Sequence, residues 1–365
     1  MNLRYATVLS LLVGVISVFA QTPQTEFQID LQSHGWKLDR RVLNGSTLPY
    51  TVDFADDDSL WVVFPAETAE GLQSRDVRSE YRGKVLHITP SGEVSAGCDT
   101  AHLAWNYVML IAHRSDGFTL GTAHELIAFD GRCKQKSSHP TTSKTNITPS
   151  PNRGVIYLSD NTPRVSILSN EDLSKMKEFD LPEQTSGKHV LFGDEMAAFP
   201  NTVHTKGCWR DEFSKMTIAT GQVAPWTTIE CARYNLLGDE HVIYTSLNGD
   251  SSLEITGGSG VPSSKYTPPR NMYVDRAVID RNPVESSQSL RVVEELIETK
   301  GRHPSLDMSG KFVGREIVLL DMHTGTALLT IKVPMDTLTY SYALSRDGKK
   351  LAVLLNSQVS VYKVP

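Results

Sequence analysis

Four stretches of the sequence contain arginine and few aromatic residues, and three of them also contain histidine; these side chains could bind acidic groups. They are Arg75, Arg78 and Arg82 in the first stretch, His113 and Arg114 in the second, His204, Trp209 and Arg210 in the third, and Arg302 and His303 in the fourth. The planar fork of an arginine guanidinium binds carboxylate, phosphate and sulfate groups with paired hydrogen bonds. Such a surface would suit a protein, a peptide or an acidic small ligand. The alternative is a solvated surface whose charges pair with one another.

Local motifs of the common enzyme classes do not occur in this sequence. There is no Gly-x-Ser-x-Gly, no His-Glu-x-x-His and no phosphate-binding Gly-Lys-Ser or Gly-Lys-Thr. His102, His113 and His124 recur every eleven residues, but the strands and turns between them would not bring the three rings together. The three aspartates at 56–58 lack the further ligands of a calcium loop and suit a hairpin turn. We therefore predict no metal site and no cofactor.

The N-terminus predicts export. Arg4 supplies a positive charge, residues 6–19 form an apolar run, and small residues precede Gln21, as in a cleaved signal peptide over residues 1–20. The alternative is an uncleaved membrane anchor, for which the run is short, since a bilayer core needs about 20 apolar residues. No second run of that length follows, so we expect no membrane span after cleavage. We therefore expect a periplasmic or secreted protein, and the short leader favours a bacterial envelope.

Four cysteines form an even set in an exported chain: Cys98, Cys133, Cys208 and Cys231. They lack the paired spacing of a zinc site, so two disulfides are expected in an oxidising compartment. Of the three possible pairings, we favour Cys98 with Cys133 and Cys208 with Cys231, because each would link neighbouring repeats. Buried free thiols are the alternative.

Composition and charge limit the possible partners. The 365 residues are 39% hydrophobic and 21% charged, which is ordinary for a soluble globular protein with a large core. The formal net charge of -6 gives no overall attraction to phosphate backbones, and no nucleic-acid partner is expected.

The last stretch, residues 338–363, shows how the chain is built. Alternating apolar runs are separated by a tight turn at Asp347 and Gly348, which is a strong hairpin signal. The run around Leu351 and the ending at residues 359–363 resemble a repeat of the WD40-like and YVTN-type β-propeller superfamily. Tyr362 and Lys363 stand where many such repeats carry Trp-Asp, so the resemblance is to the broad superfamily. It implies an all-β propeller.

Similar units recur from residue 49 to the C-terminus, and they divide most simply into seven blades of a single domain. Six or eight blades are the alternatives. The last unit lacks its outermost strand. We expect the N-terminal region, residues 21–48, to supply it through an alternating strand at residues 36–41, because ring closure removes exposed strand edges. Residues 257–269 are predicted to form a flexible linker between units.

The insertions fall on one side of the predicted disc. With strands a to d counted outward in each blade, the b-to-c turns and the d-to-a connections share one face, which we name the b–c face. Long b-to-c loops are predicted at residues 65–83, 113–124, 200–214 and 298–315, whereas the turns of the opposite face are short. Long loops on a rigid scaffold often carry binding residues. The four arginine-containing stretches lie on these loops.

These patterns predict an exported, monomeric, non-catalytic propeller that acts as a binding or scaffold module through the long-loop b–c face. The alternative is a propeller enzyme of the hydrolase, lactonase or quinoprotein dehydrogenase type. Its site would lie at the central opening and take residues from several blades, which leaves no local motif. Fold alone does not decide between the two.

Overall fold

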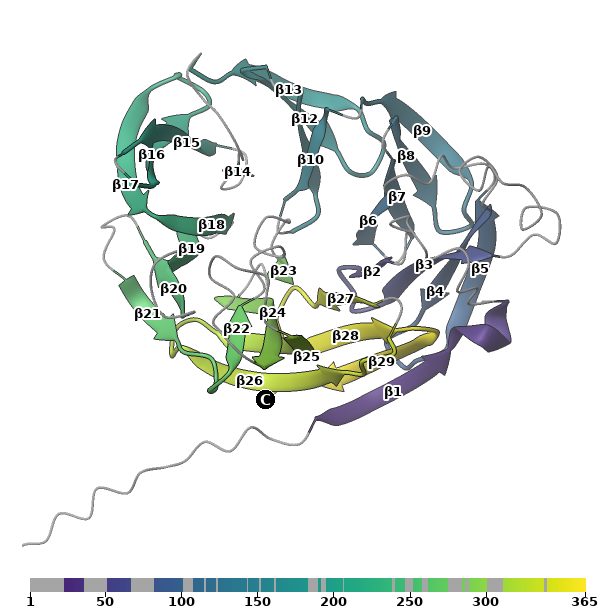
Figure 1. Ribbon diagram of the computed structural model, residues 1–365. Helices are drawn as coiled ribbons and strands as arrows, with labels where there is room; N and C mark the ends of the chain where they lie inside the picture. Colours follow the sequence, from purple (N-terminus) through teal and green to yellow (C-terminus); the bar gives the residue numbers. More distant parts are fainter. Residues whose placement is uncertain are drawn as a thin grey trace, which may run out of the picture.

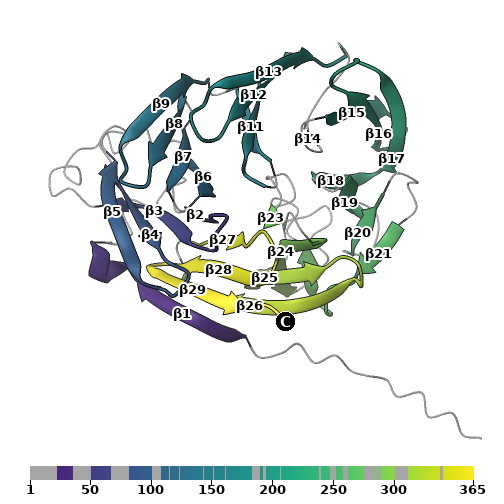
Figure 2. The ribbon, with the colours of Figure 1, turned by 180° about the vertical axis from the view of Figure 1, so that it is seen from behind.

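Short alternating runs of apolar residues form antiparallel β-sheets, and seven such sheets are arranged as a ring in the computed structural model (Figures 1 and 2). The structure describes residues 23–35, 51–66, 82–100, 108–114, 116–122, 124–142, 144–150, 152–160, 162–182, 190–191, 195–205, 207–237, 240–246, 252–257, 262–274, 284–285, 289–300, 311–337 and 340–365. The predicted seven-bladed β-propeller is thereby confirmed.

The first four blades follow the chain, and within each blade the strands run in order from the innermost outward. Blade one holds β2 (Thr51–Phe54), β3 (Leu60–Ala66), β4 (Arg82–Ile88) and β5 (Val94–Thr100). Blade two holds β6 (Val108–Arg114), β7 (Gly117–Thr122), β8 (Glu125–Asp130) and β9 (Gln135–Pro140). Blade three holds β10 (Asn146–Pro149), β11 (Val155–Ser159), β12 (Arg164–Ser169) and β13 (Lys175–Asp180). Blade four holds β14 (Val190–Leu191), β15 (Met196–His204), β16 (Trp209–Thr217) and β17 (Val223–Glu230).

The remaining three blades complete the ring. Blade five holds β18 (Ala232–Leu237), β19 (His241–Ser246), β20 (Leu253–Thr256) and β21 (Pro262–Tyr266). Blade six holds β22 (Met272–Val274), β24 (Arg291–Lys300), β25 (Lys311–Asp321) and β26 (Thr326–Val333), and β23 (Val284–Glu285) also pairs with β24. Blade seven holds β27 (Tyr340–Leu344), β28 (Lys350–Leu355), β29 (Gln358–Lys363) and, outermost, β1 (Gln24–Asp30).

An N-terminal strand closes the ring, as predicted, but it is a different strand. β1 pairs antiparallel with β29, so the first and last described strands lie side by side (Figure 1). The expected closing strand at residues 36–41 lies outside the described residues, and its place in blade seven belongs to β1. Ile29 of β1 is buried in the core shared by blades seven and one, while Gln28 faces outward. A single buried isoleucine among polar neighbours is a weak strand signal, which is why the alternating residues 36–41 were the stronger candidate in the sequence.

The core lies between the blades. Val62 and Phe64 of β3 pack toward blade seven, whereas Trp61 and Val63 of the same strand pack toward blade two. Both faces of a blade are therefore buried, and its central strands are nearly continuous apolar runs. β28, with Leu351 to Leu354 almost fully buried, is the clearest example.

Two segments predicted as irregular are strands. Residues 113–124 were expected to form a b-to-c loop, but they contain β7, the second strand of blade two. Thr119, Gly121 and Thr122 are buried in it, and their small or hydroxyl-bearing side chains conceal the apolar run. The linker predicted at 257–269 likewise contains β21, whose first residue is a proline at an outer edge, where a missing backbone donor is tolerated.

Over the residues that the structure describes, no helix is long and apolar enough to cross a membrane.

Candidate functional site

The b–c face is the candidate site, and three of the predicted residues are described on it with their side chains. His204, Trp209 and Arg210 all belong to the b-to-c hairpin of blade four. Arg82 begins β4 on the same face, but its side chain lies outside the description. The remaining predicted residues of this face, Arg75, Arg78, Arg302 and His303, lie outside the described residues.

His113 and Arg114 were predicted on this face, and that prediction was wrong. Because residues 117–122 form β7, both residues lie at the end of the inner strand β6, at the turn between strands a and b. That turn belongs to the opposite face of the disc. The backbone oxygen of His113 accepts a hydrogen bond of 2.7 Å from Nη2 of Arg346, which lies in the corresponding turn of blade seven. His113 therefore belongs to a contact between blades and does not join the blade-four residues.

The blade-four hairpin replaces the loop predicted at 200–214. β15 and β16 pair from Met196 with Thr217 to His204 with Trp209, so the segment is strand almost to its tip. The turn is closed by Thr205, whose backbone nitrogen and hydroxyl both donate to the backbone oxygen of Cys208, at 2.9 and 2.8 Å. Gly207 in this turn has φ of 106°, a conformation that favours glycine. A paired hairpin holds its side chains more firmly than a loop would.

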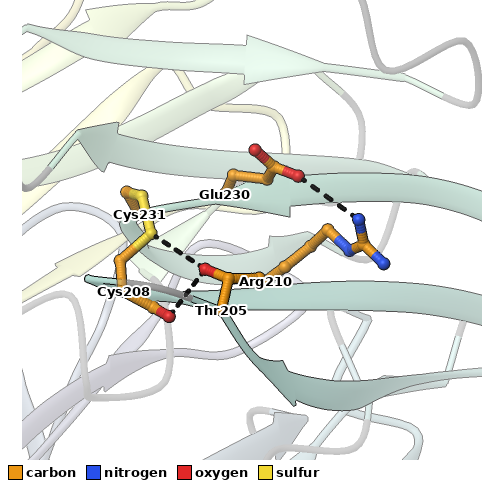
Figure 3. The surroundings of a disulfide bond; sticks show 5 residues. All are labelled: Thr205, Cys208, Arg210, Glu230 and Cys231. Atoms are coloured by element: carbon orange, nitrogen blue, oxygen red, sulfur yellow. Dashed lines mark hydrogen bonds and ion pairs between the residues drawn. A yellow bond between two sulfur atoms is a disulfide. The ribbon is translucent and has the colours of Figure 1, made fainter.

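A disulfide between Cys208 and Cys231 fixes the tip of this hairpin (Figure 3). Cys231 is the single residue between β17, the outer strand of blade four, and β18, the inner strand of blade five. Its backbone nitrogen also donates to the backbone oxygen of Trp209 at 3.0 Å. The hairpin tip is therefore tied to the point where the chain passes into blade five. This pairing confirms the prediction for Cys208 and Cys231.

The second predicted disulfide is also present. Cys98 of β5 bonds to Cys133, which lies in the turn between β8 and β9. It links blade one to blade two, and no described cysteine is free. Both bonds thus join neighbouring parts of the ring, which was the basis for choosing these pairings.

Arg210 is neutralised by its neighbours. Its Nη2 atom lies 2.7 Å from the Glu212 carboxylate, and Nη1 lies 3.7 Å from that of Glu230 across the strand pair (Figure 3). Glu212 and Glu230 remain 44% and 60% exposed. For this residue, the alternative of a surface whose charges pair with one another holds. Two carboxylates around one guanidinium leave this side of the hairpin with a net negative charge.

The other side of the hairpin carries Asp211, a polar residue of the predicted loop that was not among the predicted binding residues. Side chains alternate along a strand, so Trp209, Asp211 and Phe213 share the side that faces blade five. Trp209 is 42% exposed at the tip, whereas Asp211 is only 3% exposed. Register places His204 opposite Trp209 and Thr202 opposite Asp211. An aspartate at a buried position becomes recognisable only when the alternation of β16 is known.

Asp211 is an unusual carboxylate. The hydroxyl of Thr202 donates to its Oδ1 atom. Burial raises the pKa of Asp211 above its ordinary value, and the Thr202 hydrogen bond opposes that shift. No group of three or more metal-ligating side chains was found among the described residues, there or elsewhere. The candidate site therefore consists of the exposed Trp209 indole, the buried Asp211 carboxylate and the Cys208–Cys231 disulfide, which fixes the hairpin that carries both.

Comparisons with known proteins give no family. No protein-family model matches the sequence, and no curated protein matches it. Among solved structures, the chain is similar to a chain in the crystal structure of the mitotic checkpoint complex. The match covers 100% of this chain and 99% of that chain, with a TM-score of 0.49 and 12% sequence identity.

Proposed function

We propose that this protein is an exported, monomeric, non-catalytic propeller that binds a protein or peptide partner through its b–c face. The observation that carries the proposal is the disulfide-fixed hairpin of blade four, which presents Trp209 to solvent on that face. Tryptophan is enriched among the residues that dominate binding energy at protein interfaces. Holding it rigidly reduces the entropy lost on binding.

Other exposed apolar side chains support the same face. Five large apolar residues are strongly exposed in the described part of the chain. Trp209, Phe312 at the start of β25 and Met335 in the connection from β26 to β27 lie on the b–c face. The other two, Met176 and Val223, lie on outer strands at the circumference. Exposed apolar residues gathered on one face are typical of an interaction surface.

Export is part of the proposal. The apolar leader at residues 6–19 motivates it, and two disulfides fit an oxidising compartment. Amino-terminal sequencing or intact mass of protein recovered from the exported fraction checks this point. A chain that still carries residues 1–20 in the cytoplasm would contradict it.

Photo-crosslinking from position 209 tests the binding function. A photoreactive amino acid replaces Trp209 in the full chain, and a matched protein carries it in place of Met176 on the circumference. The expected result is an adduct with one exported protein or peptide from the native host that forms only from position 209. Excess wild-type protein should suppress it, whereas excess W209A should not. Equal labelling from both positions would overturn the proposal, as would stoichiometric calcium or a chromophore in the purified protein, which would favour a propeller enzyme.

A further inference from the structure

A groove of about 520 Å³ lies between β5, the outermost strand of blade one, and η1 (Leu31–His34), the short 3₁₀ helix that follows β1. Both ribbon views show η1, in purple, beside one end of β5 (Figures 1 and 2). The groove is lined by the six consecutive residues 94–99 of β5. Side chains alternate between the two faces of a strand, so an unbroken run means that the backbone of β5 forms part of the wall.

β5 is an edge strand without the usual protection against pairing with another chain. It pairs with β4 on one side, and no described strand pairs with its other side. Lysine and proline on edge strands commonly prevent such pairing. Of the seven outermost strands that the structure describes, five contain a lysine or a proline, whereas β5 and β1 contain neither. The backbone groups of β5 can therefore accept an extended peptide.

The wall formed by β5 is fixed in position, and the groove is open at its middle. The Cys98–Cys133 disulfide ties β5 to blade two. Gly97 pairs with Leu86 in register, and a Cβ atom on Gly97 would lie 3.0 Å from Cδ2 of Leu86. Because glycine has no side chain, this space remains available to a ligand.

A lysine lies at one end of the groove. Nζ of Lys84 is 3.1 Å from the position that a Cβ atom on Gly35 would take, so the ammonium lies against the η1 wall, which also carries His34. No carboxylate among the described residues is within ion-pair distance of this ammonium. Asp99, which pairs with Lys84 in register, is exposed to solvent. An acidic side chain of a bound peptide would supply the missing carboxylate.

We propose that an extended acidic segment of a partner protein adds to the edge of β5, with one of its carboxylates at the Lys84 ammonium. Hydrogen bonds between the two backbones supply affinity, and the charged contact selects an acidic side chain. This site goes beyond the proposed function, because it lies on blade one and uses no residue of the blade-four hairpin.

Isothermal titration with hexapeptides tests the proposal on the full chain. The probe is acetyl-Thr-Glu-Val-Glu-Val-Thr-amide, whose β-branched residues favour an extended conformation. One matched peptide carries lysine in place of glutamate, and another carries N-methyl groups on alternate amides, which block pairing with a strand. We expect the glutamate peptide to bind wild-type protein and the two matched peptides to bind at least tenfold more weakly.

Substitutions in the groove locate the binding. K84M should weaken binding of the glutamate peptide about tenfold, and G97V should abolish it by filling the groove. D99N removes the one carboxylate that lines the groove and should tighten binding. The matched control is K136M on the outer strand β9, which should change the affinity less than twofold. Thermal melts check that each variant is folded; if G97V is not, K84M and D99N carry the comparison.

Four outcomes would overturn the proposal. Equal binding of the N-methylated peptide would exclude strand addition, and equal losses in K84M and K136M would indicate diffuse charge attraction. Preference for the lysine peptide, or weaker binding by D99N, would favour a basic ligand. Absence of binding at millimolar concentration would exclude the site. W209A should bind the glutamate peptide as wild type does, so failure of this test leaves the proposed b–c face function standing.

Discussion

Asp53 and Arg153 are 100 residues apart in the sequence, and their side chains form an ion pair with Oδ2 of Asp53 3.2 Å from Nε of Arg153. The pair connects the inner strand of blade one to the first turn of blade three. The same Asp53 oxygen accepts a hydrogen bond of 3.0 Å from the backbone nitrogen of Ala112 in blade two. One carboxylate therefore joins three consecutive blades at the inside of the ring.

Replacing Arg153 by methionine should destabilise the ring because it leaves the Asp53 carboxylate buried without its cation. We expect a loss of about 3–5 kcal/mol in the free energy of unfolding at pH 7, measured by urea denaturation. The matched control is R164M, which removes an arginine that is 61% exposed in its pairs with Glu178 and Asp180. That change should leave the urea midpoint close to that of wild type, because solvent screens an exposed ion pair. Equal effects of the two substitutions would contradict the structural role of the pair.

The cost of R153M should also depend on pH. Burial raises the pKa of Asp53 above its ordinary value of 3.8, although Arg153 and two backbone hydrogen bonds lower it. A raised pKa in the folded state means that this group contributes most stability below pH 3.8 and loses it as the pH rises through the folded pKa. Protonated Asp53 needs no cation, so R153M should lie nearer to wild type at pH 4 than at pH 7. A deficit that stays constant with pH would contradict this account.

Much of the fold could be predicted from the sequence because each blade is encoded by local patterns. The turn at Asp347 and Gly348, with apolar runs on both sides, marks blade seven without further information. β7 was missed because Thr119 and Thr122 are polar residues buried between other strands, and only the tertiary structure shows that burial. Strand β1 was missed because most of its side chains are exposed.

The candidate site was harder to predict than the fold. Trp209 and Arg210 were identified by residue type, and the disulfide by parity and spacing. Residue type alone does not show that Glu230 of the neighbouring strand neutralises Arg210. That contact depends on the register of β16 with β17. The importance of Asp211 follows from its burial, which a sequence position alone does not give.

D211N should test the cost of keeping Asp211 buried. Because burial raises the pKa of Asp211, the stability contributed by its protonated form is present below pH 3.8 and is lost as the pH rises through the folded pKa. Asparagine stays neutral and still accepts the Thr202 hydrogen bond, so D211N should be at least as stable as wild type at pH 7. Thermal melts between pH 3.5 and 8 should show that the advantage of D211N grows with pH. An advantage that shrinks with pH, or a large loss of stability at pH 7, would show that the ionised carboxylate is stabilised within the fold.

Ring closure by β1 gives a further prediction. Ile29 is 8% exposed and packs in the core of blades seven and one, so I29A should lower the free energy of unfolding by about 2–4 kcal/mol. Gln28 faces outward on the same strand, and Q28A should cost less than about 0.5 kcal/mol. Urea denaturation measures both. A deletion of residues 24–30 that leaves the melting temperature unchanged would show that another segment closes the ring.

The two disulfides should contribute similarly to stability but differently to binding. Their cysteines are separated by 23 and 35 residues, and loops of these lengths give each bond about 3–4 kcal/mol through the entropy of the unfolded chain. C208S/C231S and C98S/C133S should therefore unfold at similarly lowered urea concentrations. Only C208S/C231S releases the strand that carries Trp209, so it should speed hydrogen exchange at residues 207–213 and lower the yield of partner crosslinking from position 209. C98S/C133S changes a bond between blades one and two and should leave both properties as in wild type. Equal effects of the two variants on binding would mean that the Cys208–Cys231 bond supports the ring as a whole and does not position the hairpin.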